Sequence, residues 1–572
     1  MSKSAAATTT PEWVSRSNEN AQIMLDVIGR FSPEQASFIG VTGYDDRVAD
    51  LGPDLTRRFV TAMKGAVDAL RAKIAAEKHA AVRQDLEIMV KRGELSIEGA
   101  ELGERLLLPY HNVNETIFQG LRALLDDQVP QERRRVAVER LRRYAGLGGE
   151  TPLARLAEER IREKLGNTAL VGPFRGEVDK DFANSGPLLR GAEALFRKYE
   201  ITGFEEPYTA LSKQLDAYWA FVREQVVPRC RPHFQLPPEL YANNIARIGI
   251  DMPIPELTGR ARAAFREIQN EMQSLAMLVA KERGLKDTGY RSVLAELKKK
   301  QIVGEQILPH YEERIRQLEE LIREHDIITV PERPMQIKLA SEAESAAIPA
   351  PNMRPPRMIG NTGELGTFVL PLRIPGEPGK QQLQFDDFTF DAASWTLAAH
   401  EGRPGHELQF AAMVEAGVSI ARAIFAMNST NVEGWALYAE AEMKPFEPLE
   451  GQLAALQHRL LRSARAFLDP GLQDGSITRD EAMRVLREDV VLSEAMATQE
   501  VERYTFWAPA QAPSYFCGYQ RLLEIRTDAE RALGPRFDRH KYHDFLLAQG
   551  LLPPSLLRKA VLEEFVPAHK AS

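Results

Sequence analysis

The sequence predicts a predominantly α-helical fold, and three features of the chain support this prediction. Between about residues 11 and 330, apolar residues recur at steps of three and four among charged ones, most regularly in 54–90 and 257–283, as they do in amphipathic helices. Short runs of strand-forming residues gather only between about residues 330 and 390, where prolines and glycines concentrate. From Asp391 onward the helical pattern returns. We therefore expect a large helical protein with a small β-sheet element.

Four segments follow from these patterns. They are a disordered tail (1–10), a helical N-terminal lobe (11–330), a strand- and loop-rich segment (331–390) and a helical region (391–572) that carries the candidate metal site. The runs 335–339 and 366–372 are the clearest predicted strands, and Asp391 is a suitable N-cap for the helix that follows. No clear boundary separates the segments, so we expect one integrated fold.

Length and charge narrow the range of partners. A chain of 572 residues exceeds the roughly 250–300 residues at which a single core stops growing, so two or more lobes are expected. The chain is 44% apolar and 27% charged, with 73 basic and 81 acidic residues and a net charge of −8. This balance provides no basic stripe for nucleic acid. We expect no nucleic-acid partner, and the sequence leaves the oligomeric state open.

The cysteines and the apolar runs indicate the compartment. Only Cys230 and Cys517 are present, so neither a disulfide framework nor a cysteine-based zinc site is expected. Residues 1–10 contain neither the apolar core of a signal peptide nor a lipobox cysteine. No apolar run approaches the ~20 residues of a membrane span. We therefore expect a cytoplasmic protein without a membrane partner.

Two histidines and a glutamate give the strongest chemical signal, in the stretch 399–409, AHEGRPGHELQ. Neutral imidazoles bind zinc, and a nearby carboxylate can act as the base that activates water, so a metal-dependent hydrolase is the first hypothesis. In zincin helices the two histidines are four residues apart, which places both rings on one face. His400 and His406 are six residues apart, and on an unbroken helix their directions differ by roughly 120°.

Pro404 and Gly405 permit two interpretations of this spacing. Pro404 cannot donate to the carbonyl of His400, and Gly405 accepts unusual backbone angles, so a bulge could bring His406 back beside His400. Alternatively, the helix ends near Arg403 and a new one begins at His406 after a Pro-Gly turn, with both histidines as ordinary polar residues. Spacing alone does not decide between the two.

The stretch 428–440, NSTNVEGWALYAE, supplies a third candidate ligand. In glutamate-liganded zincins, a carboxylate from a separate downstream helix completes three protein ligands, and Glu433 fits this role. Thr430 and Glu433 also have the spacing of a capping box, in which the glutamate only closes a helix end. Glu440 lies two turns further along the same face, where it orients a ligand histidine or is simply solvated.

The C-terminal region offers supporting residues. Tyr515, Tyr519, Leu522 and Arg526 share one helix face. Tyr515 is a candidate donor to an oxyanion, and Arg526 is suited to gripping a substrate carboxylate. Such a stripe is equally typical of core packing, with the arginine bound to a structural glutamate. His543 is a further candidate substrate-binding residue, although a capping or solvated role is commoner at a charged helix start.

These motifs resemble the bacterial DUF885 family, a group placed among zincin-like metallopeptidases. The most specific pair is HExxPGHxxQ, from His400, followed by EGWALYAE, from Glu433. The likeness extends over nearly the whole chain, through FSPEQAS (31–37), GYD (43–45), SYxxG (514–518), FD (537–538) and YHD (542–544).

The resemblance implies a large helical zincin-like fold with a deep cleft. It also implies a Zn²⁺ ion held by His400, His406 and Glu433, with Glu401 as the general base that takes a proton from water and delivers it to the leaving amine. The chain departs from the family pattern after this glutamate, where a glycine is followed by Arg403, a residue expected at a cleft rim or in solvent.

The resulting prediction is a zinc-dependent hydrolase that cleaves peptide or small amide bonds, of the dipeptidase, carboxypeptidase or amidase type. Because the family's reaction is weakly defined, two alternatives stay open. One is a non-peptidase metallohydrolase that acts on an ester or a modified metabolite. The other is a catalytically inactive helical protein that binds a ligand or serves as a scaffold.

Overall fold

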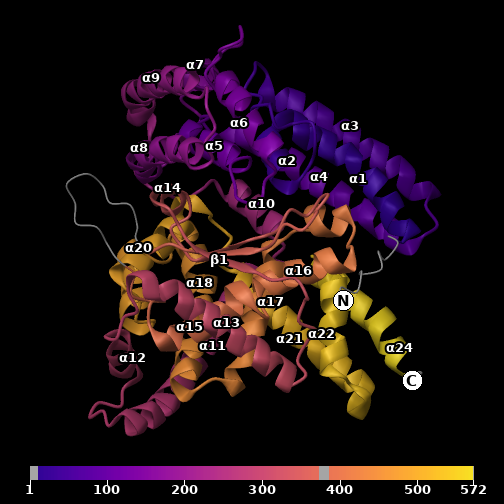
Figure 1. The fold of residues 1–572 in the computed structure, drawn as a ribbon, viewed down its shortest axis with the longest axis vertical. Helices are drawn as coiled ribbons and strands as arrows, with labels where there is room; N and C mark the ends of the chain where they lie inside the picture. The colour runs from indigo at the N-terminus through magenta and orange to yellow at the C-terminus, as the bar shows by residue number, and fades with distance from the viewer. Residues whose placement is uncertain (1–10, 373–384, 571–572) are drawn as a thin grey trace.

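The computed structural model describes residues 11–372 and 385–570, which form a predominantly helical molecule (Figure 1). The helical prediction is confirmed, and so is the small sheet, which has three strands. The predicted disordered tail, residues 1–10, lies outside the described residues. Within the described ranges, no helix is both long and apolar enough to cross a membrane.

The first ten helices form the upper part of the molecule in Figure 1. The long helices α3 and α4 pack along each other, with α1 against both. Their buried faces contribute methionine, leucine and valine side chains to the largest hydrophobic cluster. The bounds are α1 Glu12–Phe31, α2 Pro33–Ile39, α3 Leu55–Ala76, α4 Ala80–Leu106, α5 Val113–Arg122, α6 Gln131–Tyr144, α7 Leu153–Leu165, α8 Arg175–Lys198, α9 Glu205–Phe221 and α10 Pro238–Ile248.

Helices α11 (Ile254–Arg283), α12 (Tyr290–Lys298) and α13 (Ile307–Glu324) lie in the lower part of the molecule, among the C-terminal helices (Figure 1). Helix α11 packs along α18 (Leu449–Asp474), and their apolar faces belong to one hydrophobic cluster. The predicted segment 11–330 therefore contributes helices to both parts.

The small sheet lies between the two parts, at the level of the label β1 in Figure 1. Its strands are β1 (Gln336–Leu339), β2 (Asn352–Arg354) and β3 (Thr367–Leu370). The order is β1-β3-β2, with β1 parallel and β2 antiparallel to β3. The central strand β3 is buried along its whole length, as both its edges are paired. The predicted runs 335–339 and 366–372 contain β1 and β3, whereas β2 and the short helix α14 (Glu342–Ala347) were not predicted.

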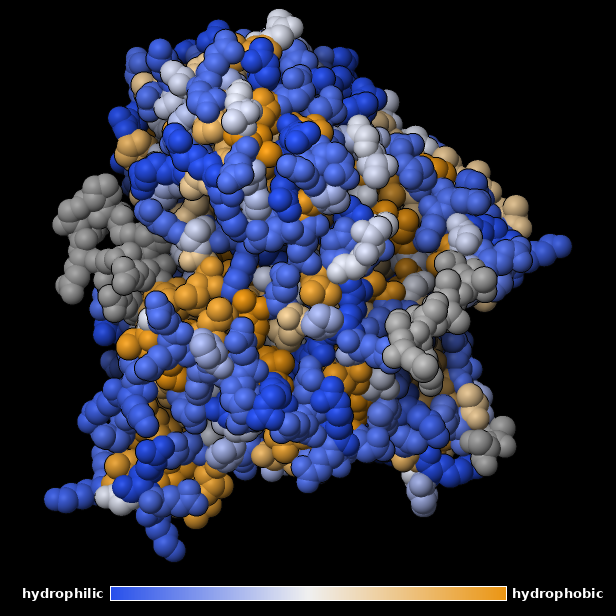
Figure 2. Space-filling model, in the orientation of Figure 1, coloured by the Kyte–Doolittle hydropathy of each residue, from blue (hydrophilic) through white to orange (hydrophobic). Residues whose placement is uncertain are grey.

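The remaining helices complete the lower part. Phe388, Trp395 and Leu437 from this region join α1–α4 residues in one cluster, so apolar packing connects the two parts. Figure 2 shows hydrophobic residues concentrated at the level where the parts meet. The bounds are α15 Asp391–Leu397, α16 His406–Ala416, α17 Ser429–Met443, α19 Arg479–Arg484, α20 Glu494–Glu502, α21 Ser514–Leu533, α22 Arg539–Ala548, α23 Pro554–Ala560 and α24 Val566–Lys570.

Candidate metal centre

The backbone around the two histidines combines features of both interpretations. Helix α15 continues into a π-helical segment, Ala398–Gly402, which contains His400 and Glu401. The helix then ends, Arg403 is extended, the Arg403–Pro404 peptide bond is cis, and α16 begins at His406. The chain therefore breaks and restarts, as the second interpretation holds, yet the two imidazoles lie together, with ring centroids 4.7 Å apart.

Gly405 occupies a place where no side chain fits. A Cβ atom at this position would lie 2.0 Å from the carbonyl oxygen of His400 and 2.3 Å from that of Ala399. On its other side the turn is held by Trp435, whose indole Nε1 donates to the carbonyl of Pro404 at 3.0 Å. The backbone at Gly405 packs directly against the end of the π-helical segment, and this contact brings His406 beside His400.

Arg403 is buried, contrary to the expectation of a cleft rim or a solvent-facing position. Its Nε donates to Glu407 at 2.7 Å and its Nη1 to Glu319 of α13 at 2.6 Å. Its Nη2 donates to the carbonyl of Arg333 at 2.6 Å. Carboxylates on two elements thus compensate the buried guanidinium, and the arginine anchors the turn to α13 and to the loop before β1.

Helix α17 presents Glu433 to the histidines, and its cap excludes the alternative role for this residue. The N-cap is Asn428, whose side chain accepts a hydrogen bond from the backbone N–H of Asn431 at 2.8 Å. The hydroxyl of Thr430 instead donates to the carbonyl of Ile248, at 3.2 Å. The capping box considered for Thr430 and Glu433 is therefore not formed.

Three ligand atoms converge at this point. Glu433 Oε2 lies 3.5 Å from His400 Nε2 and 3.2 Å from His406 Nε2. These three residues form a group whose potential ligand atoms all lie within 4.8 Å of one another. Two atoms bound to one tetrahedral zinc ion at 2.0–2.2 Å lie about 3.3–3.6 Å apart. The observed separations fit a shared ion.

An unsatisfied polar atom supports the same assignment. Glu433 Oε2, the oxygen that faces both Nε2 atoms, is buried and has no hydrogen bond of regular geometry among the described residues. Burial of a polar atom without a partner costs about 1–3 kcal/mol, so such atoms are rare without a functional reason. Two imidazoles and one carboxylate form a donor set typical of catalytic zinc, which leaves a fourth position open. The residues present therefore fit a zinc ion.

Glu440 orients the first histidine, one of the two roles considered for it. Its Oε1 lies 2.6 Å from His400 Nδ1, and its Oε2 accepts from the Thr396 hydroxyl at 2.5 Å. Burial would raise the pKa of Glu440, but the charge of Arg462 and the bond to His400 lower it to about 2. A charged carboxylate on Nδ1 directs Nε2 of the same ring toward the Glu433 side.

The protonation of His400 follows from these neighbours. Burial lowers the pKa of His400, but the nearby carboxylates of Glu433 and Glu440 outweigh it and raise the pKa to about 9. His400 and His406 together hold the pKa of Glu433 well below its usual range, although burial opposes this. A metal ion binds neutral imidazole, so it competes with a proton at His400.

Glu401 lies at the edge of the cluster. Its Oε1 is 4.0 Å from His400 Nε2, and its side chain is 10% exposed. Burial raises the pKa of Glu401, and the nearby imidazoles of His400 and His406 oppose that shift. The carboxylate is therefore next to the ligand atoms and retains some contact with solvent.

Tyr515 lies against the cluster from helix α21. Its ring stacks on the imidazole of His400, with centroids 6.1 Å apart and planes inclined by 11°. Its hydroxyl accepts a hydrogen bond from Arg503 Nη2 at 2.8 Å. Helix α21 approaches α17 closely because Gly434 and Gly518 meet at the crossing, where a Cβ atom on Gly434 would lie 2.7 Å from Gly518 Cα.

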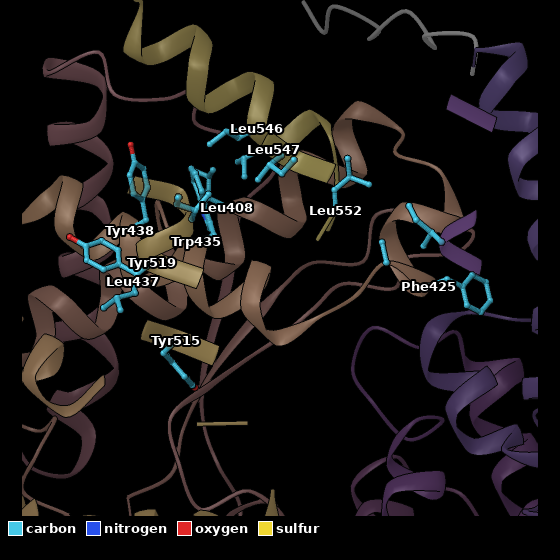
Figure 3. Packing of buried hydrophobic residues seen from close by; sticks show 14 of the residues in the cluster. Leu408, Phe425, Trp435, Leu437, Tyr438, Tyr515, Tyr519, Leu546, Leu547 and Leu552 are labelled. Carbon is cyan, nitrogen blue, oxygen red and sulfur yellow. The ribbon is translucent and has the colours of Figure 1, made fainter. Parts of the chain in front are cut away.

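Arg526 and His543 lie in a separate network that does not contact the three ligand residues. Arg526 donates to Glu442, to Glu530 at 2.7 Å and to the Tyr438 hydroxyl at 2.7 Å. The buried ring of His543 has Nε2 2.9 Å from the same hydroxyl and Nδ1 2.9 Å from a backbone carbonyl. Figure 3 shows Tyr438 among buried hydrophobic residues and Tyr515 pointing a different way. These contacts favour structural roles over the predicted substrate binding.

Four further polar residues support the centre and were not predicted from the sequence. Gln511 donates to Glu433 Oε1 at 3.3 Å, and its own side-chain oxygen accepts from Arg503. Glu500 holds Arg465 in a bidentate pair at 2.6 and 2.7 Å, and Arg465 lies over the Tyr515 ring, 4.4 Å from its centroid. Apart from Glu500 and Arg503, which are three residues apart on one helical stretch, no spacing pattern connects these residues, because they come from separate helices and from the loop before α21.

A cavity of about 1440 Å³ is lined mainly by α3, α4, α7, the end of α10 and residues 506–511, and its lining does not include the three candidate ligands. Gln511 belongs both to this lining and to the partners of Glu433. This cavity therefore reaches the residue that donates to the third candidate ligand.

Two solved structures share the fold. A candidate lipoprotein from Colwellia psychrerythraea has a TM-score of 0.76 at 17% identity, covering 98% of this chain and 100% of that chain. A candidate lipoprotein of unknown function from Shewanella oneidensis has a TM-score of 0.72 at 17% identity, covering 96% and 100%. A match to Pz peptidase A with an inhibitor, at 12% identity and covering 90% and 97%, has a TM-score of 0.27, which is too low to support any argument.

The comparison of sequences places the chain in a family. No curated protein matches it. The model of the bacterial proteins of unknown function called DUF885 matches residues 33–561, which include the ligand cluster, Glu401, Glu440 and Tyr515. The chain belongs to the DUF885 family.

Proposed function

We propose that this protein is a zinc-dependent hydrolase that cleaves peptide or small amide bonds. The observation that carries the proposal is the convergence of His400 Nε2, His406 Nε2 and Glu433 Oε2, with separations of 3.5 and 3.2 Å to the carboxylate oxygen. A carboxylate base, Glu401, adjoins this point. An inactive scaffold would give no reason to place a second carboxylate, that of Glu401, beside two histidines and a buried glutamate.

The side chains around the centre have distinct roles in this proposal. Zinc held at this position supplies Lewis-acid chemistry, because it makes water a stronger acid and polarises a substrate carbonyl. The Glu401 carboxylate accepts a proton from water and passes it to the leaving amine, a role favoured by its raised pKa. The Tyr515 hydroxyl accepts from Arg503, so its own proton remains available for a developing oxyanion.

Metal content tests the first half of the proposal. Wild-type protein loaded with zinc and dialysed is expected to retain about one equivalent per chain by elemental analysis, because three donors converge on one point. His400→Ala and His406→Ala are expected to lose most of it. His540→Ala is the matched control, since this histidine pairs at the surface with Asp326 and Asp544. Wild-type protein without stoichiometric metal, or an unchanged content in His400→Ala, refutes the site.

Substrate profiling tests the second half. A library of short peptides and small amides, compared with a panel of esters, separates a peptidase from the alternative metallohydrolase. Turnover that disappears with a chelator and returns with zinc is expected on the peptides. Turnover of the esters alone would refute the peptidase and favour the non-peptidase metallohydrolase.

We also propose a cytoplasmic location. Cys230 and Cys517 are both free thiols, which suits a reducing compartment. Two proteins of the same fold are described as candidate lipoproteins, so the location needs its own test. Fractionation of cells that express the full-length native gene decides it, and recovery in the membrane fraction would overturn the proposal.

A further inference from the structure

Most charged side chains that line the cavity beside the metal centre are already paired. Acidic and basic side chains on α3, α4 and α7 form ion pairs with one another, and Arg105 of α4 pairs with Glu239 of α10. Arg231 has no acid partner, but its guanidinium donates to three backbone carbonyls. The pairs are Lys64–Glu101, Lys164–Glu104, Arg160–Glu163, Arg57–Asp54 and Arg105–Glu239.

In the described part of the lining, Arg92 and Arg247 are the basic side chains that remain unpaired, and the acidic side chain without an ion pair, Glu177, lies near Arg231 instead. Both line the cavity, and among the described residues neither guanidinium has a hydrogen bond or an ion pair. They come from packed helices, because Asn243 of α10 donates to Leu95 of α4 at 3.4 Å and to Glu98 at 3.0 Å. Burial lowers the pKa of Arg92, and the nearby charge of Arg247 lowers it further. The two guanidinium groups thus lie on packed helices, line the same cavity and are near enough for the charge of Arg247 to act on Arg92.

This arginine pair lies on the side of the cavity that leads to the metal centre. Ile248, next to Arg247, accepts from Thr430 at 3.2 Å, one turn before Glu433 on α17. Asn244 of the same helix contacts the carbonyl of Pro509 at 3.5 Å, within the lining segment that ends at Gln511. The cavity lining therefore carries both arginines and, at Gln511, a side chain that donates to the candidate ligand Glu433 at 3.3 Å.

We propose that Arg92 and Arg247 form an anion subsite that binds a carboxylate of the substrate, so that the preferred substrates are peptides bearing a free carboxylate. Two unpaired guanidinium groups in a partly enclosed space are suited to a planar, bidentate anion, and the carboxylate is the anion that peptides carry. The inference rests on the proposed peptide hydrolase function. The carboxylate is either that of the C-terminus or that of an aspartate or glutamate side chain.

Equilibrium binding tests the subsite independently of turnover. The full-length chain carrying Glu401→Gln prevents consumption of the probes. Calorimetry compares three peptides: N-acetyl-trialanine with a free C-terminus, its C-terminal amide, and the amide of N-acetyl-Ala-Glu-Ala. The second peptide has no carboxylate, the first carries one at its C-terminus and the third carries one on its glutamate side chain, so they distinguish the two sources. Arg92→Gln and Arg247→Gln are then added singly to this background.

The expected result is carboxylate-dependent binding that each arginine substitution weakens about tenfold, the scale of a lost charge-assisted bond. Arg105→Gln is the matched control, because that arginine lines the same cavity but is paired with Glu239, and it is expected to leave affinity unchanged. Adding His400→Ala removes the metal and excludes binding of the carboxylate to zinc as the cause.

The outcomes separate this inference from the proposed function. Carboxylate-dependent binding that both arginine substitutions weaken, together with a wild-type protein that neither retains metal nor turns over peptides, keeps the subsite and refutes the hydrolase. Equal binding of the acid and amide peptides, or equal loss in Arg105→Gln, overturns the subsite. Zinc-dependent turnover could persist in that case.

Discussion

Glu401 is the residue whose substitution separates metal binding from catalysis. Its Oε1 is 4.0 Å from His400 Nε2, beside the ligand atoms but outside their group of three. Glu401→Gln is expected to retain zinc and to lose turnover by about 10²- to 10⁴-fold, because an amide cannot accept the proton. Steady-state kinetics on a cleaved amide, with metal analysis of the same sample, checks this. A variant with full activity contradicts the assignment.

Glu440 is expected to affect affinity for the metal rather than the identity of the ligands. Glu440→Gln removes the charge that faces His400 Nδ1, and loss of such a partner costs about 10- to 100-fold in metal affinity. Competition with a chromophoric zinc chelator measures the change. Glu442→Gln is the control from the same helix, since Glu442 pairs with Arg526 outside the cluster. Equal affinities in the two variants would refute the orienting role.

At the residue scale, the ligand types were predictable and their supports were not. His400, His406 and Glu433 are residues that bind zinc, and their motifs mark them in the sequence. Gln511 is 78 positions from the carboxylate that it contacts, in a loop without periodicity. A contact between a loop and a helix depends on how whole helices pack, which local spacing does not encode.

At the element scale, the break between the π-helical segment and α16 resolves the six-residue spacing, and Gly405 makes the break possible. Gly405→Ala is expected to destabilise the fold by about 1–3 kcal/mol or more and to reduce zinc binding, because its Cβ would lie 2.0 Å from the His400 carbonyl oxygen. Denaturant unfolding and metal analysis measure both effects.

A second glycine provides the control for this prediction. Gly65 lies within helix α3 and has open space where a Cβ would be added. Gly65→Ala is therefore expected to stabilise the chain by about 0.4–1 kcal/mol without affecting zinc. If Gly405→Ala bound zinc as tightly as Gly65→Ala, the close packing of Gly405 against the His400 carbonyl would not be required for the site.

The elements differ in how well the sequence predicts them. Helices and the two longer strand runs follow from hydrophobic periodicity, which is a local property. The geometry of 398–406 does not, because helix propensity alone allows either a bulge or a break between the histidines. Tertiary contacts decide it: Trp435 holds Pro404 and the carboxylates of Glu407 and Glu319 hold Arg403.

At the scale of the whole molecule, two of the three candidate ligands are held by protein side chains and all three lie on well-packed helices. Glu440 fixes His400, Gln511 contacts Glu433, and the buried core on both sides belongs to the largest hydrophobic cluster. Removal of zinc is therefore expected to leave the helical content unchanged and to lower the thermal midpoint. A ligand at about 1,000 times its Kd stabilises the native state by about 4 kcal/mol, a difference that a calorimetric scan resolves.

The comparison variant is His400→Ala, in which the midpoint should not depend on zinc because one of three donors is missing. Far-UV circular dichroism of the chelated wild type checks that the helices persist. A chelated wild type that loses its helices would mean that the metal organises the fold, contrary to the hydrogen bonds that already hold His400 and Glu433. A zinc-dependent rise in His400→Ala equal to that of wild type would place the stabilising metal elsewhere on the chain.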